Sequence, residues 1–135
     1  MASPSLALQG AVVAALKAAT PVSALVGARV YDSVPASSPF PYISLGDGTM
    51  TLDEGQDYEG ENVAFTVHAW SRATGFPEAK NLAWAIKQTL HGAELTVLGY
   101  HLVIIALVDD TTFRDPDGLT SHAALNFRAE LEPTS

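Results

Sequence analysis

The sequence TTFRDPDGLTSHAALNFRAEL, residues 111–131, contains two stretches separated by the polar segment RDPDG. From Ala123 to Leu131 every second residue is apolar and most residues between them are polar. This alternation predicts a strand with one buried face. The four residues expected to form the preceding turn are Asp115, Pro116, Asp117 and Gly118. Proline presets the second turn position and glycine accepts a positive φ, so two antiparallel strands are expected.

The acids of this turn raise the alternative of a metal site. A calcium loop spaces its oxygen ligands at alternating positions and has a bidentate glutamate at the twelfth. Counted from Asp115, the twelfth position is Asn126, and Pro116 interrupts the alternation. The turn is therefore the favoured interpretation, no metal ligand is predicted, and Asp117→Asn is expected to cost almost nothing.

The remaining elements are predicted from periodicity, proline and glycine. The first two are a helix over 4–19 and a short helix that begins at Thr20 and stops at Gly27. Three strands follow: one within ARVYDSV (28–34), one that begins at Tyr42, and one over 62–70. A helix over 76–92 and three further strands complete the chain. LVIIALV (102–108) is apolar on both faces, which is typical of a central strand covered on both sides. The fold class is α+β: one domain, 1–135, with a mostly antiparallel sheet of five to six strands and two main helices.

Residues 49–62, TMTLDEGQDYEGEN, contain five acids and two glycines and offer little to bury. Such a segment predicts a long hairpin or a mobile loop, with its acidic part at about 52–62. Trp84 lies off the apolar stripe of the helix over 76–92, so we expect it either at an interface or under another segment of the same chain.

Composition excludes several function classes. Seven Lys and Arg against fifteen Asp and Glu give a net charge of −8, which argues against a surface that grips nucleic acid. No apolar run approaches the ~20 residues of a membrane span, and no cysteine is present. No nucleophile, nucleotide-binding or metal motif occurs, so neither catalytic residues nor a cofactor are predicted. One alternative remains, a small metal-dependent or acid/base enzyme using His68, His101, His122 and Asp109 or Asp110. Another is a ligand-binding domain with an enclosed apolar pocket.

Three blocks in order are more specific than any single motif. They are VYDSVP with PFPY (30–42), HAWSRATG with EAK (68–80), and RDPDG with T, H and FRA (114–129). Together they resemble the tail-completion, or tail terminator, family of long-tailed phages, prophages and gene transfer agents.

The resemblance implies a structural protein without a cofactor. It implies a homohexameric ring that stops the growing tail tube, meets the tail tube protein and the head-tail connector or stopper, and lets DNA pass without specific binding. Such a protein would assemble in the host cytoplasm and then reside in the particle's tail. Candidate contact residues are Trp84, the small residues Gly10 and Ala14 of the first helix, and Asp53, Glu54, Asp57, Tyr58, Glu59 and Glu61 of the acidic hairpin. As an alternative, the acids of this hairpin line the lumen of the ring.

Overall fold

A computed structural model describes residues 3–55 and 58–134, and within 47–59 it describes the backbone alone. In chain order the elements are α1 (Pro4–Ala18), α2 (Thr20–Val26), β1 (Val30–Tyr31), β2 (Tyr42–Gly55), β3 (Tyr58–Ser71), α3 (Pro77–Leu90), β4 (Tyr100–Arg114) and β5 (Ser121–Pro133). None of these helices alone is long and apolar enough to cross a membrane. Together α1 and α2 pass that test by length and composition only, and they are bent by 79° at their junction.

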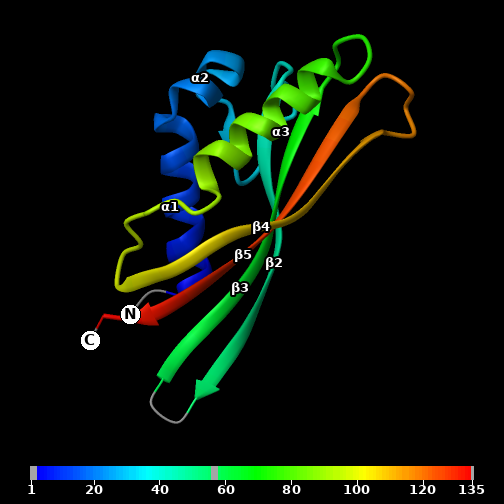
Figure 1. The fold of residues 1–135 in the computed structure, drawn as a ribbon. Coiled ribbons are helices and arrows are strands. Elements are labelled where there is room, and N and C mark those ends of the chain that lie inside the picture. Colours follow the sequence, from blue (N-terminus) through cyan, green and yellow to red (C-terminus); the bar gives the residue numbers. More distant parts are fainter. Residues whose placement is uncertain (1–2, 56–57, 135) are drawn as a thin grey trace.

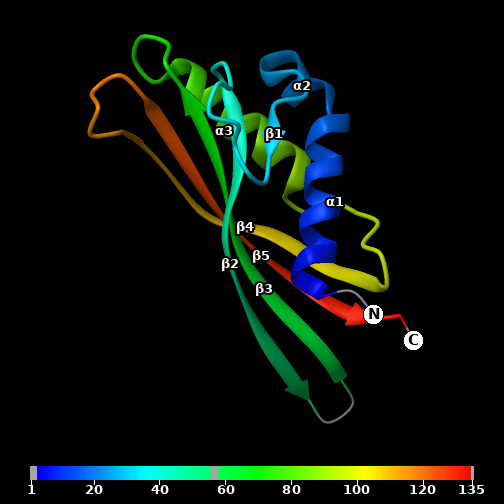
Figure 2. The ribbon, with the colours of Figure 1, turned by 180° about the vertical axis from the view of Figure 1, so that it is seen from behind.

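The five strands form one sheet in the order β1-β2-β3-β5-β4. Among the strands of the described residues, β1 and β2 pair in parallel, and the pairs β2–β3, β3–β5 and β4–β5 are antiparallel. The helices α1 and α3 cover one face of the sheet, and α2 lies beside both of them (Figures 1 and 2). The predicted α+β class, with a mostly antiparallel sheet and two main helices, is confirmed.

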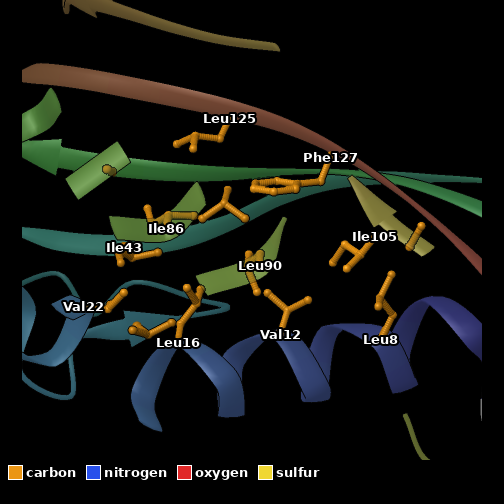
Figure 3. Close-up of a cluster of buried hydrophobic side chains, with 14 of the residues drawn as sticks. Leu8, Val12, Leu16, Val22, Ile43, Ile86, Leu90, Ile105, Leu125 and Phe127 are labelled. Atoms are coloured by element: carbon orange, nitrogen blue, oxygen red, sulfur yellow. The ribbon is translucent and has the colours of Figure 1, made fainter. Parts of the chain in front are cut away.

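The core lies between the two main helices and β5, as Figure 3 shows. Leu8, Val12 and Leu16 recur at helical spacing, so one side of α1 is apolar and becomes buried. The side chains that they meet are Ile86 and Leu90 of α3 and Leu125 and Phe127 of β5. On β5 the residues Ala123, Leu125, Phe127, Ala129 and Leu131 are all buried, as their alternation predicts.

The prediction of a central strand for residues 102–108 is wrong, because β4 is an edge strand. Only Ile105 of this run is fully buried, whereas Val103, Ile104 and Val108 are exposed. Register shifts between Leu102 and Ile104 and between Leu107 and Asp109 place an extra residue at each site. Such bulges break the alternation of faces, so the run is apolar although only part of it meets the core.

Two other strand predictions also need correction. The strand expected directly after Gly92 is reduced to one isolated bridge between Val97 and Tyr100, because the chain turns at Gly99 with φ 84°. The strand expected in ARVYDSV comprises only Val30–Tyr31. In contrast, the acidic segment forms a hairpin, which is the first of its two expected forms. Its strands β2 and β3 are paired along their whole length: Tyr42 lies opposite Trp70 at one end, and Gly55 lies opposite Tyr58 at the other.

Residues Asp115 to Gly118 connect β4 to β5. The Gly118 N–H donates to the Asp115 carbonyl at 3.0 Å, and Gly118 has φ 73°. The Asp117 carboxylate accepts hydrogen bonds from the backbone N–H groups of Leu119 (2.8 Å) and Thr120 (2.9 Å), and from the Thr120 hydroxyl (2.7 Å). These bonds, those from Thr120 first, lower the pKa of Asp117. The expectation that Asp117→Asn costs almost nothing stays a prediction, and these bonds argue for a larger loss of stability, since asparagine lacks the charge and the second acceptor oxygen.

We expect Gly118→Val to lower the free energy of unfolding by about 1–2 kcal/mol, because a β-branched residue is strained at positive φ. A Cβ at Gly118 meets no atom within 4 Å, so the cost comes from the backbone alone. Urea unfolding measures it. The matched variant Gly118→Asn should lose less, since asparagine tolerates this conformation. Equal losses for both variants would contradict this explanation.

Candidate interaction surfaces

A group of polar and aromatic side chains lies on the sheet face opposite the helices. His68, Trp70, Phe113, Asp115 and His122 form this group, which we call the His–aromatic cluster. His68 and His122 are neighbours across β3 and β5, and their Nδ1 and Nε2 atoms are 2.6 Å apart. The Trp70 ring stacks on His122 with 3.7 Å between centroids, and Phe113 lies against the other side at 4.6 Å. The cluster gives the outer face of the sheet a small packed layer of its own.

His122 is buried although it lies on the face of the sheet opposite the helices. Its Nδ1 lies 3.4 Å from the Asp115 carboxylate, an arrangement that leaves Nε2 to accept from His68. Burial lowers the pKa of His122, and the Asp115 carboxylate opposes this shift only in part. Gly46 of β2 is required beside the cluster, because a Cβ there would collide with the His68 ring.

We expect the protein to lose stability as the pH falls from about 6.5. The unfolded imidazole of His122 binds a proton near its ordinary pKa of 6.5, whereas the folded one, with its lowered pKa, does not. Protonation therefore favours the unfolded chain below about pH 6.5, and this contribution is constant at higher pH. Urea unfolding at pH 5.5 and 7.5 tests this. The difference in the free energy of unfolding between the two pH values should become smaller in His122→Gln. It should be preserved in the control His101→Gln, because His101 is exposed. An unchanged difference in His122→Gln would contradict the assignment to His122.

The residues of the enzyme alternative do not form one site. His101 pairs with Glu132 near the start of β4, whereas His122 pairs with Phe113 near its end. Asp109 accepts a hydrogen bond from the Asn126 amide at 2.7 Å. Within residues 3–55 and 58–134 no three His, Asp or Glu side chains are placed to hold a metal ion. The alternative is therefore not supported.

A groove of about 610 Å³ lies between residues 92–97 and the first half of β4. Its lining includes Glu94, Thr96 and His101 together with the exposed Val103 and Ile104, and it is open to solvent. It is not the enclosed apolar pocket that a ligand-binding domain requires.

The exposed side of α3 carries an aromatic residue and two lysines. Trp84 is 58% exposed, so no other segment of the described chain covers it, and that alternative is wrong. The Lys87 ammonium lies 4.7 Å from the centre of its indole ring. Lys80 is exposed one turn earlier. We call Lys80, Asn81, Trp84, Lys87 and Gln88 the α3 outer face; an uncovered tryptophan beside a cation is typical of a contact surface.

The other sequence candidates lie on two separate elements. Gly10 and Ala14 are exposed on α1, and a Cβ at Gly10 would meet no atom within 4 Å. Asp53 and Glu54 lie on β2, and Tyr58 and Glu59 on β3. Asp57 lies outside the described residues.

Glu61 differs from the other hairpin acids because it is half-buried at the base of the hairpin. Burial raises the pKa of the Tyr100 phenol, and the Glu61 carboxylate raises it further. Glu61 thus faces the body of the protein.

The exposed apolar residues of β4 form a surface that sequence reasoning missed. Val103, Ile104 and Val108 lie on an edge strand, and such an edge can pair with another chain only where the same chain leaves it uncovered. In the middle of this edge, the Gly92 N–H donates to the Ile105 carbonyl at 2.8 Å, and His91 Nδ1 accepts from the Leu107 N–H at 2.9 Å. The apolar run at 102–108 was the signal in the sequence. It indicates that these side chains become covered, but not whether the same chain or another chain covers them.

Comparison with known proteins places this fold among tail proteins. The sequence matches the family described as "Tail completion protein gp17" over residues 10–132. The tail completion protein gp17 of Bacillus phage SPP1 is 31% identical over 124 residues, which are 92% of this chain and 91% of the relative. A chain in the "Virion of native gene transfer agent (GTA) particle" is 31% identical with a TM-score of 0.88, covering 98% of this chain and 99% of that one. The structure of bacteriophage SPP1 gp17 is 28% identical with a TM-score of 0.64, covering 93% and 88%.

Proposed function

The chain belongs to the tail completion protein gp17 family, and from this premise we propose that six copies form a ring on the end of a tail tube. The family membership makes the chain a structural part of a phage or gene transfer agent particle, not an enzyme. In the proposed role the ring stops the addition of tube subunits and presents the surface to which the filled head docks.

The observation that carries this proposal is the end-to-end likeness to one chain of the gene transfer agent particle. A likeness that leaves almost no residue of either chain unmatched supports the use of this fold as a single domain, 1–135, inside an assembly. The exposed Trp84 and the exposed apolar residues of β4 add physical support. No part of the described chain covers these side chains, and exposed apolar surface of this kind is typical of contacts with other proteins.

In this role the partners are other copies of the chain, the tail tube protein and the head-tail connector or stopper. The DNA passes through the ring without specific binding, since a protein with a net charge of −8 repels phosphates rather than holding them. Assembly takes place in the host cytoplasm, and the ring then stays in the tail of the particle.

Tails produced without this protein test the proposal directly. Negative-stain microscopy should show tubes of uncontrolled length, or tails that do not join heads. Supplying the intact chain from a second gene should restore joined tails of uniform length. Normal joined tails in its absence would refute the function.

A further inference from the structure

The sheet face opposite the helices carries a hollow next to the His–aromatic cluster. Its volume is about 420 Å³, and it spans the strands β3, β5 and β4. On β3 and β5 its residues lie an even number of positions from His68 and His122, so the alternation of side chains places them on the same face as these histidines. We call it the outer-face hollow, and its lining includes Ala64, Thr66, Val108, Asp109, Asn126 and Arg128.

The outer-face hollow has a small apolar side and a fixed carboxylate. Ala64 contributes only a methyl group, and Val108, which lies at a bulge of β4, is 60% exposed. The Thr66 hydroxyl donates to the Asn126 amide oxygen at 2.7 Å, and the Asn126 amide N–H donates to Asp109 at 2.7 Å. This chain of hydrogen bonds orients the Asp109 carboxylate at the rim. A recess of this kind suits an aromatic side chain that is accompanied by a cation.

The α3 outer face presents such a side chain. Lys80 lies four residues before Trp84 and Lys87 three residues after it, so both lysines lie on its side of the helix. Neither lysine forms an ion pair with a carboxylate whose side chain the structure describes. The one acid of α3, Glu78, is half-buried and accepts a hydrogen bond from the Ser71 hydroxyl at 2.8 Å. A partner that meets Trp84 thus also meets two cations, which selects for an acidic partner.

The surface around the outer-face hollow has the complementary charge. Asp109 and Asp110 are exposed on its β4 side, and Glu130 lies two residues beyond Arg128 on the same face of β5. Arg128 is the one cation of the lining, and a guanidinium group stacks on indole rings, so it does not oppose the entry of a tryptophan. The hollow and the α3 outer face therefore match in both shape and charge.

We propose that Trp84 of one copy enters the outer-face hollow of the next copy around the ring, with its two flanking lysines facing the acids beside that hollow. This inference rests on the proposed ring. The helices cover one face of the sheet and the hollow lies on the other, so one copy cannot make this contact with itself (Figures 1 and 2). Two different patches in contact form a head-to-tail interface, the type that closes into a ring when the rotation permits.

A charge exchange tests this pairing in a host that lacks the gene and receives it from a second copy. The variants are Lys80→Glu/Lys87→Glu, Asp109→Lys/Glu130→Lys, and all four changes together. Each pair alone should reduce the yield of joined particles by about tenfold or more, because like charges then face each other. The fourfold variant keeps the native net charge of −8 and should recover most of the yield.

The matched control is Asp32→Lys/Glu94→Lys, which changes the net charge as much as the Asp109 and Glu130 pair does. Both control residues are exposed, and they lie outside the strands that form the hollow. The control should leave the yield close to that of the native chain. A fourfold variant no better than either pair, or pairs that leave the yield unchanged, would overturn the pairing.

Filling the hollow tests its role without a change of charge. Ala64→Tyr places a large side chain in the recess at an exposed strand position, where tyrosine is well tolerated. Its urea-unfolding midpoint should stay near that of the native chain, while the yield of joined particles falls by about tenfold or more. The control Ala73→Tyr lies in the exposed turn before α3 and should preserve the yield. Equal yields from the two variants would overturn the proposal.

A third measurement does not depend on yield. The chain has no cysteine, so Lys87→Cys/Val108→Cys introduces the only thiols. Oxidation of assembled particles should produce disulfide-linked multimers of this chain, whereas Lys87→Cys alone and Lys87→Cys/Leu119→Cys should not. Linked dimers of Lys87→Cys alone would show a symmetric contact through α3 and contradict the pairing, as would links to a different protein or no links from the first variant.

The outcomes separate the pairing from the function on which it rests. If the native chain supplied from the second gene copy fails to restore joined tails, the proposed function itself is wrong. If it restores them and the exchange, the filling and the linking all fail, the function stands and the pairing falls.

Discussion

Phe127→Ala is expected to lower the free energy of unfolding by about 3–5 kcal/mol, the usual cost of removing a large buried aromatic side chain. Phe127 is 1% exposed, lies on a strand paired on both sides, and stacks on Phe65 with 5.5 Å between ring centres. Figure 3 shows it where β5 faces α1 and α3, so the cavity would open at the junction of the layers.

Urea unfolding of the two proteins measures this effect. Leu119→Ala is the control, since Leu119 is exposed in the turn and its loss should change the free energy by less than about 0.5 kcal/mol. A loss below about 1 kcal/mol for Phe127→Ala would mean that this core is not the one on which the fold depends.

Trp84→Ala is expected to have the opposite profile, with little change in stability and a large change in assembly. Because the indole is mostly exposed, its removal should change the free energy of unfolding by less than about 0.5 kcal/mol. Buried tryptophans at interface centres cost 2 kcal/mol or more when truncated, so subunit association should weaken by about thirtyfold.

Unfolding and the yield of joined particles are measured on the same variant. Gln88→Ala, one turn further along the α3 outer face, is the matched control and should preserve most of the yield. Normal yield with Trp84→Ala would exclude α3 as a contact surface, whereas a large loss of stability would show that Trp84 packs within its own chain.

The elements with regular patterns were predictable from the sequence. Residues 123–131 have an apolar residue at every second position, and the helix over 76–92 has one apolar stripe between Pro77 and Gly92, so both were placed with the correct buried faces. The position of Trp84 off this apolar stripe followed from the same helical spacing, whereas its exposure did not. In each case the signal is local, because one residue's position on a strand or helix fixes the direction of its side chain.

The position of β4 was not predictable in this way. A run of apolar residues indicates that something covers it, and the sequence does not say whether that is the same chain or a partner. The bulges at 103 and 108 also carry no local signal.

Contacts between distant segments were equally hidden. Asp117 and Arg72 are brought together by folding, with 3.8 Å between carboxylate and guanidinium. The His68–His122 pair depends on the register between β3 and β5. Each of these side chains is ordinary in its own segment and gains its role only from the tertiary fold.

Cryo-electron microscopy of joined particles tests the central claim most directly, because it determines how many copies of this chain occupy the tail and where they lie. We expect six copies in a single ring at the head-proximal end of the tube. Copies distributed along the tube, or no ring at that end, would contradict it.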